Sequence, residues 1–484
     1  MSWPLDSYRT PVKGLLMPFH TRLRRPGTRY AGAVALTVAL AVLMTACGGN
    51  HPDSIFHGRT EVNRDVDHLF KLLIWAGTAV FIFVEFILIW TLVKFRARPG
   101  QPEPEHVHGN TTLEIAWTVI PLLILIVIGI PTVRTIFKTQ AKAREDALQV
   151  EVIGHQWWWE FRYPQYTTRT ASGRLDTLIT ANELYVPIGK TVNFTLKSRD
   201  VIHSFWVPAL SGKRDVVPNH TNYLWYTPDS ATADAWNGAC VEYCGTSHAN
   251  MRFKAFTVAQ SDFESWAAHQ LQPAEGSAAP ATPVIPAATG TTQTAGQVAV
   301  TPPTGAPNAA SPNATPASPA AGQPGAGVPV SPAPTTASVA QAGFVSFPRE
   351  KMPAYTIPQT PLPTDLAFDD NTLAGGNATN GAKLISTGMC IACHSIRGVP
   401  SMMGNIGPNL THIGSRTTFA GGLYPNEPKN LARWIKHSAK LKPGSLMNSF
   451  GLGEFDPVTK GTVKLGGFTD AQIADIVAYL TSLK

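Results

Sequence analysis

The chain has 484 residues, with 40 prolines and 40 glycines, and its apolar and Pro-rich stretches are unevenly distributed, so a single compact domain is excluded. Its net charge of +7 is modest and no Lys/Arg block resembles a nucleic-acid-binding arm, so no nucleic-acid partner is expected. All 5 cysteines fall inside short motifs, which leaves no spare thiol.

Residues 1–47 are typical of a lipoprotein signal region. Several arginines precede an uncharged apolar run from Ala31 to Ala46, and Cys47 follows it directly. A bulky residue, then small residues, then cysteine indicates cleavage and lipidation of Cys47 on the outer face of a bacterial membrane. The alternative is an uncleaved third membrane anchor.

Residues 48–135 contain two apolar stretches, about Leu72–Val93 and Ile115–Val133. Each is long enough to cross a hydrocarbon core of about 30 Å at about 1.5 Å per residue, so together they predict a transmembrane two-helix hairpin. Basic residues are equally frequent on both flanks, so the positive-inside rule does not orient it. Glu85 lies within the first stretch and is expected to face a partner subunit, because a carboxylate facing lipid is costly.

Residues 136–271 switch to short alternating runs, for example at 149–153, 182–187 and 191–196, punctuated by Pro and Gly. This pattern predicts an all-β sandwich.

A cluster of potential metal ligands lies in this region: Cys240, Cys244, His248 and Met251 close together, with His203 upstream. Thiols, imidazoles and a thioether suit copper and also permit zinc. A tetrahedral zinc site would leave the thioether idle, and a single blue copper would need only one cysteine. The second cysteine therefore favours two copper ions bridged by two thiolates.

These residues resemble the binuclear copper A site of cytochrome c oxidase subunit II, which implies a cupredoxin-like sandwich. The resemblance makes Cys240 and Cys244 the bridging ligands and His203 and His248 the terminal ones. It makes Met251 and the carbonyl of Glu242 weak axial ligands. It also implies that the Glu242 carboxylate reaches a magnesium ion shared with the catalytic subunit.

Two further roles come from the same resemblance. Residues 157–159 are three consecutive tryptophans, which cannot all face the core because adjacent strand residues point to opposite faces. The resemblance makes Trp157 the surface residue through which electrons enter, while Trp158 or Trp159 better fits sheet packing. It also places Glu114 at the mouth of a proton-uptake route, the alternative being a charged residue at a membrane boundary.

Residues 272–343 are dominated by Pro, Ala, Thr, Gly and Ser and predict a low-complexity linker. A flexible coil of this length has a root-mean-square span of roughly 45–50 Å. It would hold two modules at roughly millimolar effective concentration without fixing their geometry.

Residues 344–484 contain Cys390-Ile-Ala-Cys393-His394, which indicates covalent attachment of a c-type haem with His394 as an axial ligand. The surroundings resemble an all-α class I cytochrome c domain. That resemblance makes Met447 the second axial ligand and Asp470–Leu483 the terminal helix. The alternatives to Met447 are Met402, Met403 and His412.

The whole chain resembles subunit II of a caa-type cytochrome c oxidase, a respiratory electron-transport enzyme of the oxidoreductase and translocase class. The resemblance implies that electrons enter at a fused haem c and pass through copper A to catalytic subunit I, accompanied by subunit III, where oxygen is reduced to water. The external donor would be a cytochrome c or a quinol–cytochrome c reductase. Haem attachment and lipidation are both extracytoplasmic, so two crossings place the copper and haem modules outside the bacterial inner membrane.

Three other classes of protein share parts of the pattern. A copper-delivery protein would not need Met251, Glu242 or a haem. A quinol oxidase subunit II lacks the copper ligands that are present here. The copper A domain of nitrous oxide reductase has neither the membrane hairpin nor the tethered cytochrome.

Overall fold

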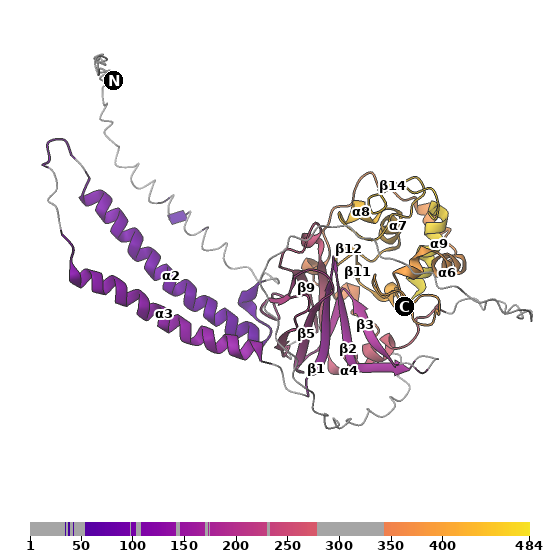
Figure 1. The fold of residues 1–484 in the computed structure, drawn as a ribbon, viewed down its shortest axis with the longest axis horizontal. Coiled ribbons are helices and arrows are strands. Elements are labelled where there is room, and N and C mark those ends of the chain that lie inside the picture. Colours follow the sequence, from indigo (N-terminus) through magenta and orange to yellow (C-terminus); the bar gives the residue numbers. More distant parts are fainter. Residues whose placement is uncertain are drawn as a thin grey trace, which may run out of the picture. The chain divides into compact units, whose positions relative to one another are not determined.

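The computed structural model describes residues 54–96, 98–102, 108–141, 146–169, 173, 175–229, 233–277 and 343–484, together with residues 34, 37, 38 and 42. The predicted lipidation site, Cys47, and most of the predicted linker lie outside the described residues. Residues 55–484 form one compact unit. It contains a helical hairpin, a β-sandwich and a helical C-terminal module (Figure 1).

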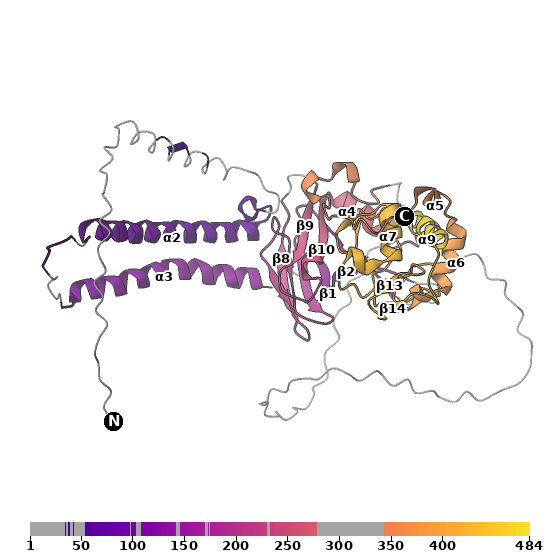
Figure 2. The same cartoon turned by 90° about the horizontal axis from the view of Figure 1, so that it is seen from above.

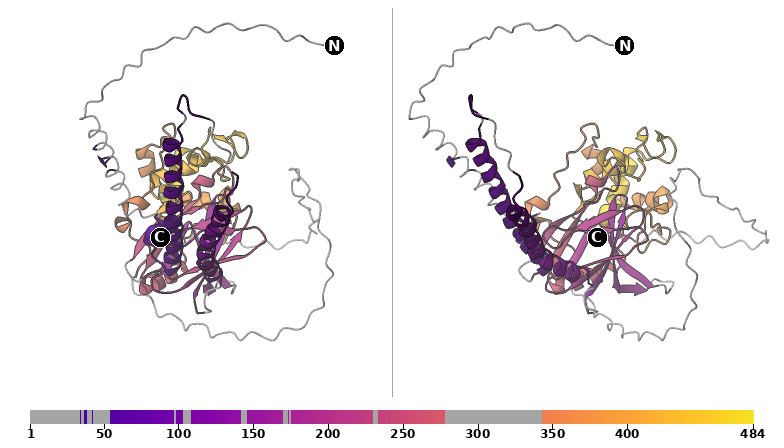
Figure 3. Two further views of the ribbon diagram at one scale, coloured as in Figure 1. Left: turned by 90° about the vertical axis from the view of Figure 1, so that its left-hand side faces the viewer. Right: turned by 60° about the vertical axis from the view of Figure 1, so that its left-hand side comes forward.

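The hairpin consists of α2, Glu61–Lys94, and α3, Thr111–Gln140, which lie side by side (Figures 2 and 3). Thr60 caps the start of α2 and Asn110 caps the start of α3 through their side-chain oxygens. Both helices are long and apolar enough to cross a membrane, and the most apolar window of each is 0% buried within the protein. Apolar side chains without protein cover are what a lipid-facing helix requires. The predicted two-helix hairpin is confirmed.

The β-sandwich contains two five-stranded sheets, ordered β3-β2-β1-β5-β8 and β4-β10-β9-β6-β7. Strands β1 and β5, and strands β4 and β10, pair in parallel, and the other pairs are antiparallel. Aromatic side chains such as Trp159, Phe205 and Phe253 are 0% exposed and fill the space between the sheets. The first sheet contains β1 Leu148–His155, β2 Trp158–Arg169, β3 Leu175–Ala181, β5 Val192–Ser198 and β8 Asn222–Tyr226. The second contains β4 Glu183–Pro187, β6 His203–Trp206, β7 Arg214–Val216, β9 Asp234–Cys240 and β10 Arg252–Val258.

Helix α4, Gln260–Gln270, follows the sandwich and packs Phe263 and Trp266 against it. We call residues 148–271 the sandwich module. The alternating runs expected at 149–153, 182–187 and 191–196 correspond to β1, β4 and β5.

The C-terminal module, residues 366–484, is built on a crossing between α6 and α9. A Cβ atom at Gly381 would lie 2.0 Å from the carbonyl oxygen of Asp475, so only glycine permits this close approach. A capping box between Thr469 and Gln472 starts α9. The helices are α5 Asp370–Ala374, α6 Ala378–Thr387, α7 Pro428–Lys436, α8 Ser438–Leu441 and α9 Asp470–Ser482. Two short ribbons pair β11 Thr418–Phe419 with β12 Tyr424–Pro425, and β13 Phe455–Asp456 with β14 Gly461–Thr462.

The predicted fold class is therefore confirmed in each of its three parts: two apolar helices, an all-β sandwich and an all-α C-terminal domain.

Candidate functional site

Five predicted copper ligands converge at one end of the sandwich module. The Sγ atoms of Cys240 and Cys244 are 3.7 Å apart. The Nδ1 atom of His203 is 3.9 Å from Cys240 Sγ, and the Nδ1 atom of His248 is 3.6 Å from Cys244 Sγ. The Sδ atom of Met251 is 3.8 Å from Cys244 Sγ. Soft sulfur atoms and ring nitrogens thus surround one small volume.

Two strands of the second sheet hold the ends of this loop. Cys240 ends β9, and Arg252 begins β10 opposite Ala239 in the antiparallel pair. The backbone N–H of Cys240 donates to the carbonyl of Met251 at 2.9 Å and closes the loop at its base. His203 begins β6, which pairs with the end of β9. The ligand positions therefore follow from the pairing of three strands.

A carboxylate orients the first histidine. The Nε2 atom of His203 lies 2.8 Å from Asp200 Oδ1, which leaves Nδ1 directed at Cys240. Such a partner fixes the ring and its tautomer for metal binding. Burial raises the pKa of the Asp200 carboxyl, but hydrogen bonds from His203, Val201 and Gln156 outweigh it and lower the pKa below 3.8. Sequence reasoning missed this role, although Asp200 stands three residues before His203.

The two thiols share one hydrogen bond. The bond from Cys244 is the largest cause that lowers the pKa of Cys240, and the same bond raises the pKa of Cys244. Both cysteines are free rather than joined in a disulfide. Because thiolates are the metal-binding form, this donor set fits a soft or borderline cation such as copper.

Trp157 is linked directly to the loop. Its indole Nε1–H donates to the carbonyl of Cys244 at 3.0 Å, and the side chain of Gln156 donates to the same oxygen at 2.7 Å. Trp159 is 0% exposed in the core, and Trp158 stacks on His155 with ring centroids 4.1 Å apart. The three tryptophans therefore take three different environments, as expected from strand geometry.

The outer side of the loop is exposed. Glu242 has an exposed side chain, and its carbonyl oxygen lies 3.2 Å from Cys240 Sγ. Tyr243 beside it is 75% exposed. The carbonyl and the carboxylate of Glu242 thus point to different surroundings, the thiol and the solvent.

The haem-attachment motif lies at the end of α6 in a tight turn. The N–H of His394 donates to the carbonyl of Cys390 at 3.0 Å, and Cys390 and Cys393 are both free thiols. The Nδ1 atom of His394 lies 2.8 Å from the carbonyl oxygen of Pro408. An Nδ1–H donated to that carbonyl leaves Nε2 as the available ligand, so these residues fit a covalently attached c-type haem. Burial lowers the pKa of His394, which favours the neutral ring.

Met447 lies on a loop that is held at two points. Its carbonyl accepts a hydrogen bond from Ser438 Oγ at 2.5 Å, and its N–H donates to Ser445 Oγ at 3.2 Å. Its side chain is half-buried against the core of the C-terminal module, as is Cys390. The three alternatives differ in environment: Met402 is 1% exposed, Met403 is 64% exposed, and His412 Nε2 lies 3.1 Å from the carbonyl of Gln272. The axial role of Met447 stays a prediction.

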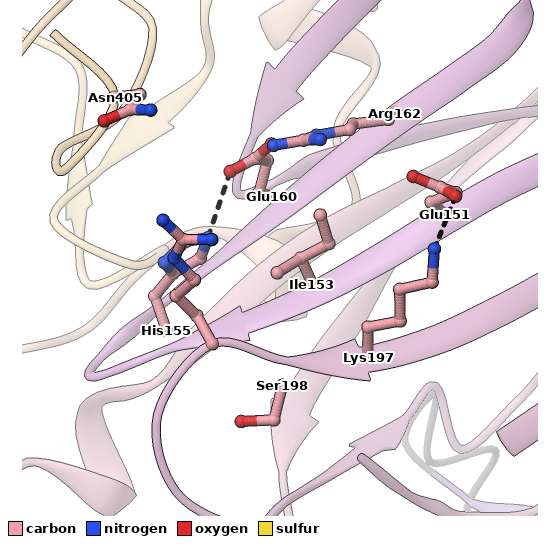
Figure 4. Close-up of a pocket in the computed structure, with 9 residues that line it drawn as sticks. Glu151, Ile153, His155, Glu160, Arg162, Lys197, Ser198 and Asn405 are labelled. Carbon is pink, nitrogen blue, oxygen red and sulfur yellow. Dashed lines mark hydrogen bonds and ion pairs between the residues drawn. The ribbon is translucent and has the colours of Figure 1, made fainter. Parts of the chain in front are cut away.

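A cavity of about 230 Å³ lies on the face of the first sheet, and no predicted copper or haem ligand lines it (Figure 4). Charged pairs line it, with His155 Nε2 3.0 Å from Glu160 Oε2 and Lys197 Nζ 2.8 Å from Glu151 Oε1. Asn405 reaches it from the C-terminal module (Figure 4). The cavity is therefore bordered by both modules.

Glu114 lies in the first turn of α3, exposed and distant from the sandwich module. Near the other end of α3, Lys138 pairs with Asp65 of α2 at 2.5 Å, and its carbonyl accepts from Trp225 of β8 at 3.1 Å. The helix between Glu114 and Lys138 is about 36 Å long at about 1.5 Å per residue, enough to cross a hydrocarbon core. Glu85 lies in the C-terminal third of α2 and is half-buried.

Three family models match this chain. The transmembrane domain of cytochrome c oxidase subunit II matches residues 57–135, the periplasmic domain of the same subunit matches residues 148–258, and cytochrome c matches residues 378–484. Cytochrome c oxidase subunit 2 of Alkalihalophilus pseudofirmus is 26% identical over 422 residues, which are 86% of each chain. The probable cytochrome c oxidase subunit 2 of Rickettsia bellii is 34% identical over 207 residues, 40% of this chain and 76% of that one. Cytochrome c oxidase subunit 2 of Bacillus subtilis is 39% identical over 194 residues, 37% of this chain and 52% of that one.

Proposed function

Because this chain belongs to the cytochrome c oxidase subunit II family and ends in a cytochrome c domain, we propose that it carries electrons from a haem c to a binuclear copper A centre. Membership makes it a subunit of an oxidoreductase complex that contains a catalytic subunit. Copper A would pass the electrons on to that subunit, where oxygen is reduced to water. The observation that carries the proposal is the convergence of two thiols, two imidazoles and a thioether on one loop.

In this proposal Cys240 and Cys244 bridge two copper ions, and His203 and His248 are the terminal ligands. Met251 and the carbonyl of Glu242 would be the weak axial ligands; they lie 3.8 Å from Cys244 Sγ and 3.2 Å from Cys240 Sγ. The copper pair, when bound, supplies a one-electron acceptor whose charge is spread over two ions. The strand pairing and the Asp200 bond hold the ligands in place, so little rearrangement accompanies electron transfer.

Trp157 is the proposed electron path into this centre. Its indole donates to the carbonyl of Cys244, so the ring is one hydrogen bond from a proposed copper ligand. This direct connection supports Trp157 over Trp158 and Trp159, which pack on His155 and in the core.

In the C-terminal module, Cys390 and Cys393 would form the two thioether bonds to the haem. His394 would supply the axial imidazole through Nε2, and Met447 the axial thioether. A His/Met pair raises the haem potential, which suits transfer to a copper acceptor. The haem would receive its electrons from a soluble cytochrome c or a quinol–cytochrome c reductase.

The remaining assignments concern the membrane and the partner subunits. The Glu242 carboxylate is exposed and would bind magnesium against catalytic subunit I, and subunit III would complete the proposed complex. Glu114, in the first turn of α3, suits a proton-uptake role on the cytoplasmic side of the bacterial inner membrane. Lipidation of Cys47 would add an anchor on the outer side.

Optical and EPR spectroscopy of the full-length chain, matured with haem and copper in detergent, tests the proposal. We expect a low-spin haem c spectrum and a copper signal in which one electron is shared over two nuclei. Cys244→Ser should keep the haem spectrum and lose the shared-electron signal. A mononuclear copper signal, or tight zinc binding without any copper signal, would contradict the proposed function.

A further inference from the structure

Two chain segments flank the linker. The segment before the linker packs on the C-terminal module, and the segment after it packs on the sandwich module. Residues 272–277, the tail segment, follow the sandwich module, yet Ala274 is 4% exposed within the hydrophobic core of the C-terminal module. The N–H of Glu275 donates to the carbonyl of Lys484 at 3.2 Å. His412 Nε2 lies 3.1 Å from the carbonyl of Gln272. The sandwich module thus sends a segment into its neighbour.

Residues 343–357, the lead segment, do the reverse. Phe347 is 3% exposed within the sandwich core, where its ring stacks on Phe256 at 5.0 Å. Its N–H donates to the hydroxyl of Tyr185 at 3.0 Å. Further along, the hydroxyl of Tyr355 donates to the carbonyl of Ala235 at 3.0 Å.

This arrangement shortens the effective tether. The C-terminal module begins at Leu366, which is 1% exposed in its core. With the lead segment fixed on the sandwich, only residues 358–365 remain between the two, and they span at most about 29 Å when fully extended. The length of the linker before residue 343 therefore does not set how far the module can move.

Charged side chains connect the two modules. Glu183, 4% exposed at the start of β4, accepts three hydrogen bonds through Oε1. They come from the N–H of Thr417 at 2.7 Å, its hydroxyl at 2.6 Å, and the N–H of Thr418 at 3.3 Å. A buried carboxylate needs such partners. Arg397 of the C-terminal module forms a half-buried ion pair with Asp176 of β3, in which Nε and Nη2 lie 3.0 and 2.9 Å from the same oxygen, Oδ2.

The loop that carries Met447 lies against the proposed copper site. Lys442, only 4% exposed, donates from Nζ to the carbonyl of Trp157 at 2.5 Å. The N–H of Arg252, one residue after Met251, donates to the carbonyl of Gly421 at 3.0 Å. A Cβ atom at Gly444 would lie 3.3 Å from the Trp157 ring and 3.1 Å from Thr246 of the copper loop.

We propose that the C-terminal module is permanently seated on the sandwich module, with the Met447 loop over Trp157. This proposal rests on the proposed function. If that function holds, Trp157 carries electrons within the chain from haem to copper A, and no external protein docks on it. The external donor then docks on the C-terminal module. The linker therefore joins two modules that stay in contact, and it does not serve as the flexible tether of a mobile domain.

Cleavage of the linker tests this in the full-length chain. A protease site is inserted between residues 278 and 342, the purified protein is cut to completion in detergent, and the fragments are separated by size at high salt. We expect the haem-bearing fragment to remain with the membrane fragment. Release of the haem-bearing fragment, with the shared-electron copper signal and the haem spectrum intact, would contradict permanent docking of the two modules. It would leave the proposed function unaffected.

Two variants of the cleaved protein test the hydrogen bonds of Glu183, one on the sandwich module and one on the C-terminal module. Glu183→Leu removes all three hydrogen bonds, and Thr417→Val removes one by a substitution of similar shape on the other module. We expect both to raise the dissociation rate of the haem fragment, Glu183→Leu at least tenfold. Glu264→Leu is the matched control, because Glu264 is an exposed carboxylate on α4 that bonds Tyr166 and Gln260 of the same module. Dissociation equal to that of the control in both variants would overturn the anchor role.

Discussion

At the scale of single residues, the proposed copper site depends on groups that never touch the metal. Asp200 holds the ring of His203, and the carbonyl of Cys244 is held by Trp157 and Gln156. Partners of this kind orient ligands and raise their basicity.

Asp200→Asn should weaken copper binding about 10- to 100-fold, because the amide no longer stabilises a histidine whose Nε2–H points at it. The measurement is a copper titration followed by the EPR signal. Asp215→Asn is the control, since Asp215 is an exposed carboxylate in β7 of the same module. Equal affinity in the two variants would mean that Asp200 is not needed to orient His203.

Met447→Leu should keep the haem attached, because Cys390 and Cys393 remain, and should lower its midpoint potential. The shift should be on the order of 100 mV, a part of the roughly 0.8 V over which axial ligands set haem potentials. A redox titration of the full-length chain measures it. An unchanged potential would assign the axial position to another side chain, such as Met403.

The residue types and spacing on the proposed copper loop were sufficient to predict that these side chains converge, because four of the predicted ligands lie within 12 consecutive residues. The role of Asp200 could not be predicted in the same way. It depends on the turn between β5 and β6, which brings its carboxylate back to Nε2 of His203.

At the scale of secondary-structure elements, the C-terminal module depends on the crossing of α6 and α9. Gly381 removes the side chain that would otherwise meet the backbone of α9 at Asp475. The terminal helix α9 was predicted from the resemblance to class I cytochromes c, whereas its close approach to α6 depends on backbone atoms that a sequence pattern does not report.

Gly381→Ala should destabilise the C-terminal module by about 1–3 kcal/mol, because the new methyl group forces the two helices apart. Thermal unfolding followed at the haem absorbance measures the change. Gly461→Ala is the control, since a Cβ there would meet only the Thr459 carbonyl, at 4.0 Å. Equal unfolding temperatures for the two variants would contradict the steric argument.

The burial of both faces of strand β4 could not be predicted from its alternating sequence. Its range was anticipated, but all five of its residues are buried, including Glu183. An isolated edge strand would expose one face. Here residues from the C-terminal module cover the other side, and those residues lie more than 230 positions away in the sequence.

At the scale of the whole molecule, each module could be predicted from its own motifs, but the contacts between modules could not. The lysines near the Met447 loop show why, because their partners lie far away in the sequence. Lys429 pairs with Asp370, and Lys436 with Asp470, at 2.7 and 2.9 Å. Lys442 is buried against Trp157. Much of the apparent positive patch is neutralised or covered within the chain.

Protonation of His412 should weaken the contact between the modules in acid, against the opposite effect of Glu183, whose pKa burial raises in the docked form. Burial, together with His269, lowers the pKa of His412 from 6.5 to about 4. The docked form thus favours the neutral imidazole of His412. Lowering the pH from 6.5 to 4 therefore favours separation of the two modules, because His412 binds a proton more readily once they separate. Arg416 opposes protonation too, whereas the backbone carbonyls of Gln272 and Lys484 favour it.

Retention of the haem fragment after linker cleavage, compared at pH 7 and pH 5, measures this dependence. The retained fraction should fall at pH 5, and His412→Gln should flatten the profile because the amide does not titrate. An equal pH dependence in the unsubstituted chain and in His412→Gln would mean that protonation of His412 does not weaken the contact between the modules.

The most direct test of the relay is time-resolved electron transfer in the full-length chain loaded with haem and copper. A photochemical reductant reduces the haem in a flash, and the haem and copper absorbances are then followed. Reoxidation of the haem should coincide with reduction of the copper, in a first-order process whose rate does not change with protein concentration. Haem reoxidation that requires collisions between molecules, or that leaves the copper oxidised, would contradict a relay within this subunit.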